Sequence, residues 1–349
     1  MQATVDLPRG GKVLVRLPNW LGDVVLCTPA LAALRKARPD LELHALVKPQ
    51  VRVAVEGLPG IRGVLSLGRT GLAGTMAQAK SLRNDGFAAA LVFPKGFREA
   101  ALVRLAGIPV RAGLDTDHRA ALLSHPVRFT EADWHEHHAR QFAKVLSPLG
   151  IELQDEGLAF PLSEEDHAQA VQVLARAGVT PPFAVFHIAA SKAPRAWHAR
   201  RFGAVGQELE ARFGVRPVLV GAPADAAVHR EFMEVCPAAA DLAGQTSLRG
   251  MGAVIAKADI FVGNDSGPMH VAAAVGTRVV ALFGPGAPHK TAPYLAHDRY
   301  RVVYADLPCS PCRQAFWQEC SPSPEGKPPC LEGVSVGAVL HACEAMLPR

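Results

Sequence analysis

A polar turn at residues 263–268 carries side chains that could hold a phosphate. It reads GNDSGP, so Asp265 supplies a carboxylate and Ser266 a hydroxyl, and His270 lies in the first turn of the helix predicted to follow. Free backbone N–H groups and the positive end of the dipole at a helix start favour a bound phosphate. An ordinary N-cap, in which Asp265 or Ser266 only satisfies the helix start, is the alternative.

Two other polar segments of the C-terminal half follow predicted strands. The loop at 187–197, HIAASKAPRAW, offers the hydroxyl of Ser191 and the cations Lys192 and Arg195, a set that suits a diphosphate. Asp225 follows the next strand, where an acid can accept both hydroxyls of a ribose. A solvated basic loop and a helix cap are the respective alternatives.

The N-terminal half has its own candidates at strand ends. Asp23 follows Gly22 just beyond the first predicted strand, and glycine permits a close backbone approach there. A carboxylate in that place could act as a general base, and a capping carboxylate is the alternative. Lys95 and Arg98 follow a later strand and could receive an anionic partner substrate, or simply be exposed charges where a helix begins.

Alternating strand and helix patterns must position these residues. Residues 12–47 and 259–284 each read as strand, turn, helix and strand, which is a βαβ unit. The whole series predicts an α/β fold with two doubly wound Rossmann-like domains, in which ligands bind beyond the carboxyl ends of the strands. We expect the domains at 1–155 and 156–333, joined by a polar linker, with a last helix in 334–349.

The composition is that of a globular protein suited to phosphate-bearing ligands. The 349 residues are 49% hydrophobic and 20% charged, with a formal net charge of +5. This mildly basic balance suits phosphates or an anionic membrane surface, and no nucleic-acid motif accompanies it. No run of 18 uncharged apolar residues occurs and the N-terminus lacks a signal-peptide core, so we expect a cytoplasmic protein.

Histidines and cysteines raise the question of a metal. The run HEHH at 135–138 does not converge on one helical face, so we expect no metal there. Four cysteines, Cys309, Cys312, Cys320 and Cys330, lie within a Pro- and Ser-rich segment. The first pair has zinc-ligand spacing but the second does not, so a structural metal, redox-dependent pairing and free thiols all remain open.

Two longer blocks of sequence resemble a known family. The first is NWLGDVVLCTPALAALRKARPD and the second is GNDSGPMHVAAAVGTRVVALFGPGAPHKTAPY. Both resemble the ADP-heptose:lipopolysaccharide heptosyltransferases, glycosyltransferase family 9. The similarity runs in order over at least residues 12–300, and the NDSGPMH block is its specific part.

This resemblance implies a GT-B architecture, in which the active site lies between two Rossmann-like domains. It implies an inverting enzyme that moves a heptose from ADP-heptose to the inner core of lipopolysaccharide, with no bound metal or other cofactor. Because that acceptor is anchored in lipid, peripheral contact with the inner membrane through basic residues around 98–111 is expected, and contact with nucleic acid is not. The last helix would cross back to pack on the first domain.

The resemblance also implies a role for each candidate residue. Asp23 resembles the base that takes the proton from the acceptor hydroxyl. The N-terminal domain would hold the acceptor, with Asn19, Lys95 and Arg98 as contacts. The C-terminal domain would hold the donor, and the matching residues are Ser191, Lys192, Arg195, Asp225, Asp265, Ser266, Gly267, Met269 and His270, with Met269 acting through its backbone N–H.

Other functions remain as alternatives at this stage. A member of the same family could use another nucleotide sugar for a capsule or a different glycolipid. A non-catalytic protein that binds nucleotide sugars would keep the same fold. A dinucleotide-dependent oxidoreductase is disfavoured, because the turn after the first strand reads PNWLGD and not GxGxxG.

Overall fold

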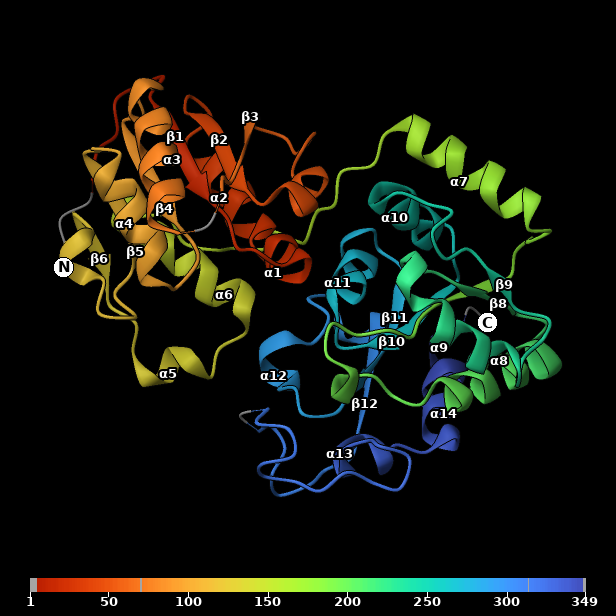
Figure 1. Cartoon of the computed structure of the whole chain (residues 1–349). Coiled ribbons are helices and arrows are strands. Elements are labelled where there is room, and N and C mark those ends of the chain that lie inside the picture. Colours follow the sequence, from red (N-terminus) through yellow and green to blue (C-terminus); the bar gives the residue numbers. More distant parts are fainter. Residues whose placement is uncertain (1–4, 70, 313, 348–349) are drawn as a thin grey trace. The chain divides into compact units, whose positions relative to one another are not determined.

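The computed structural model describes residues 5–69, 71–312 and 314–347. Residues 1–4, which begin the N-terminal stretch interpreted above, lie outside them. The chain divides into two compact units, 1–161 and 162–349, each with its own sheet and core. Figure 1 shows the two units, each with helices packed around its strands.

The first unit is built on a six-stranded parallel sheet with strand order β3-β2-β1-β4-β5-β6. Its strands are β1 (Lys12–Arg16), β2 (Glu42–Val47), β3 (Ile61–Ser66), β4 (Ala89–Val92), β5 (Val110–Leu114) and β6 (His125–Val127). Its helices are α1 (Leu21–Leu26), α2 (Thr28–Ala37), α3 (Leu72–Asn84), α4 (Phe97–Leu105), α5 (Glu131–Trp134) and α6 (His138–Ala143).

The second unit has a six-stranded parallel sheet with order β12-β11-β10-β7-β8-β9. Its strands are β7 (Phe183–His187), β8 (Arg216–Leu219), β9 (Ala240–Asp241), β10 (Ile260–Asn264), β11 (Arg278–Phe283) and β12 (Tyr300–Tyr304). Its helices are α7 (Glu164–Arg176), α8 (Ala199–Phe213), α9 (Ala226–Met233), α10 (Leu248–Ala256), α11 (Gly267–Ala274), α12 (Pro288–Thr291), α13 (Pro329–Glu332) and α14 (Val336–Met346).

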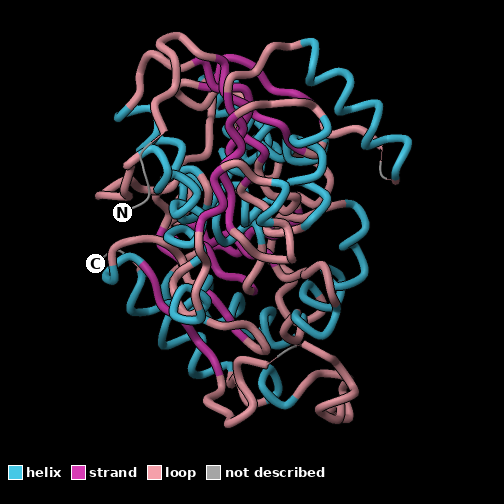
Figure 2. The backbone as a smooth tube through the Cα atoms, turned by 90° about the vertical axis from the view of Figure 1, so that its left-hand side faces the viewer, coloured by secondary structure: helices cyan, strands magenta, loops and turns pink. Residues whose placement is uncertain are grey.

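Both sheets repeat one topology. Counted from the first strand of each unit, the order is 3-2-1-4-5-6. The order in which strands are added to the sheet therefore reverses between β1 and β4 in the first sheet and between β7 and β10 in the second. The central strands are apolar and fully buried, as parallel strands covered by helices on both faces require. Figure 2 shows helices on either side of the strands. The prediction of two doubly wound α/β domains is confirmed, and each topological switch point is a natural ligand site.

Several local expectations need correction. The single helix expected within residues 12–47 breaks into α1 and α2 at Cys27, because Pro29 suits the first turn of a new helix better than a helix interior. The short edge strands β6 and β9 were not expected. The division between units falls at Pro161, a few residues after the boundary expected at 155.

The last helix packs within the second unit. Helix α14 contacts α8, β11 and β12. Val339, Leu340 and Cys343 of this helix belong to the core that also contains Phe186 and Trp197. The apolar face of α14 is therefore buried within its own unit, which corrects the expectation that it returns to the first domain.

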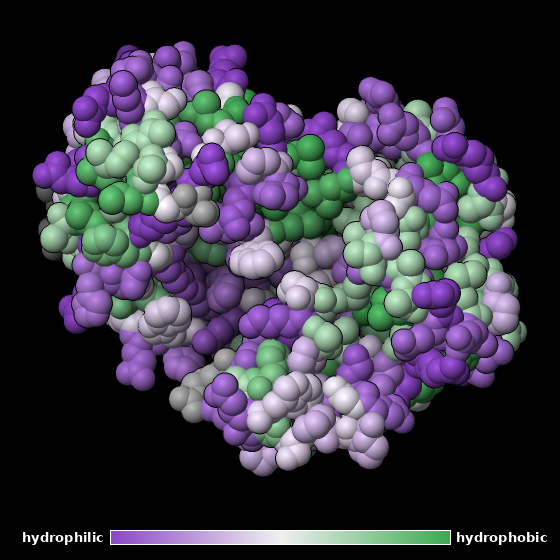
Figure 3. All heavy atoms as spheres, in the orientation of Figure 1, coloured by the Kyte–Doolittle hydropathy of each residue, from purple (hydrophilic) through white to green (hydrophobic). Residues whose placement is uncertain are grey.

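The surface mixes hydrophilic and hydrophobic residues in the view of Figure 3. Some large apolar side chains are exposed on the first unit, among them Trp20 at 67% and Leu72 at 79%. Within the described residues, no helix combines the length and the apolar character needed to cross a bilayer.

Candidate active site

The switch point of the second sheet brings together two segments that lie far apart in the sequence, the end of β10 and the loop after β7. Asn264, the last residue of β10, is fully buried. Its Nδ2 donates to the carbonyl oxygen of Ile188 at 2.8 Å, and its Oδ1 accepts from the backbone N of Trp197 at 3.0 Å. This side chain therefore fixes both ends of the loop that carries Arg195. Asn264 was not singled out from the sequence, although it stands inside the GNDSGP motif.

Arg195 and Asp265 form an ion pair across this switch point. Arg195 Nη2 lies 2.5 Å from Asp265 Oδ2 and 3.2 Å from the Asp265 carbonyl oxygen. The two side chains are 25% and 11% exposed, so solvent screens the pair less than it screens a surface pair. Nε and Nη1 of Arg195 have no hydrogen-bond partner among the described residues. A planar guanidinium so placed has donors left for an anion.

Ser266 does not cap the helix that it precedes. Ser266 is the N-cap of α11, but its side chain makes no capping bond. Its Oγ lies 3.3 Å from Nδ1 of His187, the last residue of β7. The hydroxyl therefore lies at the switch point, and the N-cap alternative for the Ser266 side chain is not observed. Gly267 follows as the first helical residue and is partly exposed.

Two other predicted donor residues are buried. Met269 is fully buried and His270 is 4% exposed. The backbone N–H of Met269, expected to face a phosphate, donates to the carbonyl oxygen of Ser266 at 3.2 Å. The first helical turn therefore uses this N–H group, and the side chain of His270 is buried beneath the start of α11.

The cations of the 187–197 loop differ in their surroundings. Ser191 and Lys192 are exposed, whereas Arg195 is partly buried. Lys192 Nζ lies 5.9 Å from the ring centroid of Phe316, within cation–π range. The loop thus carries two cations, Arg195, which is held by Asp265, and Lys192, whose side chain is exposed to solvent.

Asp225 caps its own turn and keeps one oxygen unused. Its Oδ2 accepts from the backbone N of Ala222 at 2.8 Å, as the capping alternative predicts. Its other oxygen makes no hydrogen bond within the described part of the chain. Capping and ligand binding are therefore compatible for this carboxylate.

Burial sets the charge state of His187. Desolvation is the main cause that lowers the pKa of His187 to about 4, and the nearby His229 lowers it further, while Asp225 acts in the opposite sense. The imidazole is therefore neutral near pH 7, and it can exchange a hydrogen bond with Ser266 without adding charge beside a phosphate.

The switch point of the first sheet holds the other candidates. Arg16, the last residue of β1, is fully buried, and its Nη2 donates to Asn19 Oδ1 at 2.7 Å and lies 3.4 Å from Glu99 Oε1. Burial lowers the pKa of Arg16 to about 10, which leaves it charged at neutral pH. The buried guanidinium of Arg16 therefore orients the Asn19 side chain. The apolar pattern KVLVRL gives no indication of this role of Arg16.

Asp23 lies in the first turn of α1, after the N-cap Trp20. Its carboxylate is 33% exposed, and its Oδ1 is 3.9 Å from Nδ1 of His138 on α6. A partly exposed carboxylate at a switch point can accept a proton from a bound molecule. His138 was singled out only as a member of the HEHH run, so its proximity to Asp23 is a tertiary finding.

Lys95 follows β4 in a loop that a second buried arginine supports, and Arg98 lies in the first turn of α4. Arg119 is fully buried and donates to the carbonyl oxygens of Pro94 and Gly96. Lys95 Nζ lies 4.6 Å from the ring centroid of Phe129 and 4.3 Å from that of Trp134.

The hydrogen bonds of the two cations constrain them to different degrees. Lys95 Nζ donates to Gln141 Oε1 at 2.5 Å. Arg98 makes longer contacts, with Thr75 Oγ1 at 3.3 Å and with the Arg69 carbonyl oxygen at 3.4 Å. Lys95 is therefore fixed among aromatic rings, and Arg98 is the less constrained of the two.

The residues considered for metal binding have other roles. His137 Nδ1 accepts the N-cap bond of α6 from Ala139 N at 3.3 Å. All four cysteines of the 309–330 segment are free thiols, with Cys309 exposed and Cys330 buried. Among the described residues no three cysteines lie close enough to share an ion.

One group of described residues does meet that distance criterion, and it consists of His198, Glu325 and Glu332. Arg201 already pairs with the Glu332 carboxylate and donates to the Glu332 carbonyl oxygen at 2.9 Å. The group is therefore a salt-bridge cluster that supports α13, and the Arg201 guanidinium provides the positive charge that a metal ion would otherwise supply.

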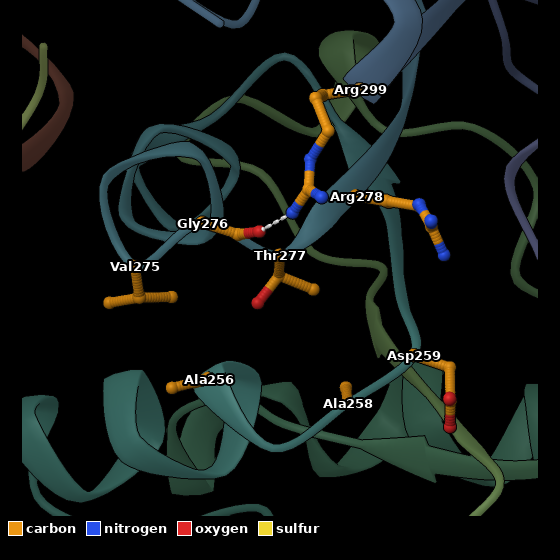
Figure 4. A pocket seen from close by; sticks show the side chains of 8 residues that line it. All are labelled: Ala256, Ala258, Asp259, Val275, Gly276, Thr277, Arg278 and Arg299. Atoms are coloured by element: carbon orange, nitrogen blue, oxygen red, sulfur yellow. Dashed lines mark hydrogen bonds between the residues drawn. The ribbon is translucent and has the colours of Figure 1, made fainter. Parts of the chain in front are cut away.

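A surface pocket lies at the opposite edge of the second sheet. Figure 4 shows that its lining comes from the segments that precede β10 and β11, with Arg299 donating to the carbonyl oxygen of Gly276. These are the amino ends of the strands, whereas Asp265 follows the carboxyl end of β10. The pocket is therefore separate from the candidate site.

Comparison with known proteins decides the family. The profile of glycosyltransferase family 9 (heptosyltransferase) matches residues 75–319. The chain belongs to glycosyltransferase family 9. It is 28% identical over 280 residues to the lipopolysaccharide heptosyltransferase 3 of Escherichia coli, with 75% of this chain and 80% of the relative covered. It is 26% identical over 311 residues to the lipopolysaccharide heptosyltransferase 2 of E. coli K12, with 84% and 87% covered.

The fold of this family 9 chain matches a solved heptosyltransferase. The structure of E. coli ADP-heptose lipopolysaccharide heptosyltransferase II superposes with a TM-score of 0.78 and 23% identity, and covers 96% of this chain and 98% of that one. The expected GT-B class, with two Rossmann-like domains in one chain, is confirmed. As a family 9 member the protein is a glycosyltransferase.

Proposed function

We propose that this enzyme transfers a heptose, with inversion, from ADP-heptose to a sugar of the lipopolysaccharide inner core. The observation that supports it most is the arrangement at the second switch point. Arg195, Asp265 and Ser266 come from two segments about 70 positions apart in the chain and lie together where a Rossmann-like sheet binds its ligand. The relatives named above are lipopolysaccharide heptosyltransferases, and the solved one is called an ADP-heptose enzyme.

The second unit is the proposed donor domain. Arg195 and Lys192 neutralise the diphosphate, Ser191 donates to it, and the start of α11 adds its dipole. Asp225 accepts from the ribose hydroxyls through the oxygen that its cap leaves unused. These groups stabilise the charge that develops on the departing ADP, which is where preorganised donors accelerate transfer most.

The first unit is the proposed acceptor domain. Asp23 takes the proton of the acceptor hydroxyl as that oxygen bonds to the anomeric carbon and the bond from this carbon to the ADP oxygen breaks. Asn19, Lys95 and Arg98 follow β1 and β4 and contact the anionic acceptor. The proposed chemistry requires no metal, because cationic side chains and helix α11 serve the leaving group.

A substitution at Asp23 tests this assignment. With ADP-heptose and a Kdo-containing core acceptor, Asp23→Asn should lower kcat by roughly 10²–10⁴-fold, the usual contribution of a general base. ADP binding by calorimetry should not change, because the proposed nucleotide site lies in the other unit. Asp85→Asn removes an exposed carboxylate next to α3 and is the matched control. Full activity in Asp23→Asn would exclude the assignment.

The nucleotide itself distinguishes the alternatives within the family. Calorimetry with ADP, UDP, GDP and NAD should show binding of ADP alone. Preference for UDP or GDP would keep the fold and reject the heptose donor, and preference for NAD would reject glycosyl transfer from ADP-heptose.

Peripheral attachment to the cytoplasmic face of the inner membrane is part of the proposal. Helices α3 and α4, which pack together, expose the apolar side chains of Leu72, Met76, Phe97 and Leu105. Arg104 is exposed on the same pair of helices. Arg111, included among the basic residues considered above, donates instead to the carbonyl oxygens of Ile108 and Leu122, so it contributes little to a membrane surface.

Vesicle binding tests this attachment. At low salt the protein should bind vesicles that contain anionic lipid and should not bind neutral ones. Leu72→Ser with Met76→Ser should weaken that binding, because both side chains lie on one face of α3. Equal binding to neutral vesicles, or none to anionic ones, would reject the attachment.

A further inference from the structure

A buried histidine, paired with a partly exposed carboxylate, lies beside the loop that carries Asp225. His229 on α9 is fully buried, and its Nδ1 is 2.8 Å from Oδ1 of Asp241, the last residue of β9. An ionised carboxylate only accepts hydrogen bonds, so the hydrogen is on Nδ1 and is donated to Asp241. The same Oδ1 accepts from the backbone N of Ala243 at 2.9 Å. This pair therefore ties α9 to the turn after β9.

The far edge of the His229 ring lies beside Gly221. A Cβ built on Gly221 would be 3.2 Å from His229 Nε2 and 2.7 Å from Asp225 Oδ2, so the ring edge and the carboxylate share one side of this glycine. The carbonyl oxygen of Gly221 accepts from Gly244 N at 3.0 Å, in the turn that Asp241 orders. Nε2 of His229 is buried and has no hydrogen-bond partner within the described residues. The ring thus forms a rigid wall next to the Asp225 carboxylate.

That carboxylate has one oxygen fixed and one unused. Ala222 N donates to Oδ2 at 2.8 Å, as described above, which orients the group from the backbone side. His229 limits the space for other orientations, and the absence of a side chain at Gly221 leaves room for the observed one. The unused oxygen is therefore held in a defined place and not averaged over rotamers.

We propose that the Asp241–His229 pair, with Gly221, positions the Asp225 carboxylate to accept the ribose hydroxyls of the donor and so selects ribonucleotides over 2′-deoxyribonucleotides. The inference rests on the proposed function, in which Asp225 binds the ribose. His229 acts here as a positioning residue. It is buried behind Gly221 and affects the ligand through Asp225.

Nucleotide discrimination gives a readout that a merely structural role does not move. A hydrogen bond from a hydroxyl to a charged acceptor contributes enough that its loss weakens binding roughly 10–100-fold. Wild-type protein should therefore bind ADP at least tenfold more tightly than 2′-deoxy-ADP. A general loosening of the site would weaken both nucleotides equally, whereas misplacement of Asp225 weakens ADP alone and brings the ratio toward one.

Calorimetry with these two nucleotides tests the proposal on the full chain. Asp225→Ala should lower the ratio to near one, and His229→Gln should lower it in the same direction. Combining His229→Gln with Asp225→Ala should produce no further change, because both act through one carboxylate. His198→Gln is the matched control, since His198 is a buried histidine whose carboxylate partners are Glu325 and Glu332, and it should keep the wild-type ratio.

Two further variants test the same point if His229→Gln does not fold. Asp241→Asn keeps an acceptor oxygen but removes the charge that orients the ring, and Gly221→Ala places a methyl group against the Asp225 carboxylate. Each should reduce the ratio while the thermal transition remains cooperative. An unchanged ratio in folded His229, Asp241 and Gly221 variants would overturn the inference alone. A wild-type protein that does not distinguish the two nucleotides would overturn the ribose role of Asp225 as well.

Discussion

The ion pair between Arg195 and Asp265 supports a quantitative prediction about donor binding. We expect Arg195→Met to weaken ADP binding by roughly 10–100-fold, because a charge-assisted hydrogen bond to a phosphate contributes about 1.5–3 kcal/mol. The substitution also leaves the carboxylate of Asp265, which is 11% exposed, without its cation. That loss should lower the free energy of unfolding by about 2 kcal/mol, between the values for surface and buried pairs.

Adenosine separates the two effects of this substitution. It lacks the diphosphate, so Arg195→Met should leave adenosine binding nearly unchanged while ADP binding falls. The variant Arg195→Lys keeps the charge on one nitrogen, and we expect intermediate ADP affinity because a point charge cannot contact Asp265 and a phosphate as a planar fork does.

Two controls make the result decisive. Arg200→Met breaks an exposed pair with Glu234 in the same unit and should change neither stability nor ADP affinity appreciably. In an Asp265→Ala background, Arg195→Met should still weaken ADP. If Arg195 only orients Asp265, the second substitution has no effect in that background, and the assignment of Arg195 to the diphosphate is refuted.

Three other outcomes follow from the second unit. The pKa of His187 is about 4 in the folded protein and 6.5 ordinarily, so between pH 6.5 and 4 only the unfolded chain takes up the proton. The free energy of unfolding should therefore fall by about 3 kcal/mol as the pH drops through this range. Urea titrations of His187→Asn should show a shallower fall. Gly263→Ala should cost about 1–3 kcal/mol in the same urea assay, because its Cβ would be 2.7 Å from the His187 carbonyl oxygen; an unchanged midpoint would contradict that contact. Burial raises the pKa of the Cys343 thiol, so iodoacetamide at pH 8 should alkylate the exposed Cys309 first and Cys343 only after unfolding, as mass spectrometry can check; equal rates would contradict the packing of α14.

Much of the fold followed from local pattern. Apolar runs that end in polar turns and continue into helices predicted two doubly wound sheets, and both were found with one strand order. The edge strands β6 and β9 escaped prediction because strands of so few residues carry little periodicity. The break at Cys27 was missed because the apolar pattern continues across it, although Pro29 marked the start of α2.

The placement of the last helix depended on tertiary packing. Its sequence shows an apolar face but does not say which sheet covers that face. The buried Trp197, whose Nε1 donates to the Val334 carbonyl oxygen at 3.2 Å, fixes the approach to α14 on the second unit. The resemblance to other two-domain proteins pointed to the first domain, whereas the apolar face of this helix is buried in the second.

The sequence by itself determined which residues stand at the strand ends. Asp23, Arg195 and Asp265 each follow an apolar run, and the carboxyl ends of parallel strands meet at one edge of a sheet. Only the tertiary structure decided their partners, which are His138 for Asp23 and Asp265 for Arg195. The reason is physical: periodicity records which face of an element is buried, whereas a contact between side chains many residues apart depends on how the elements pack.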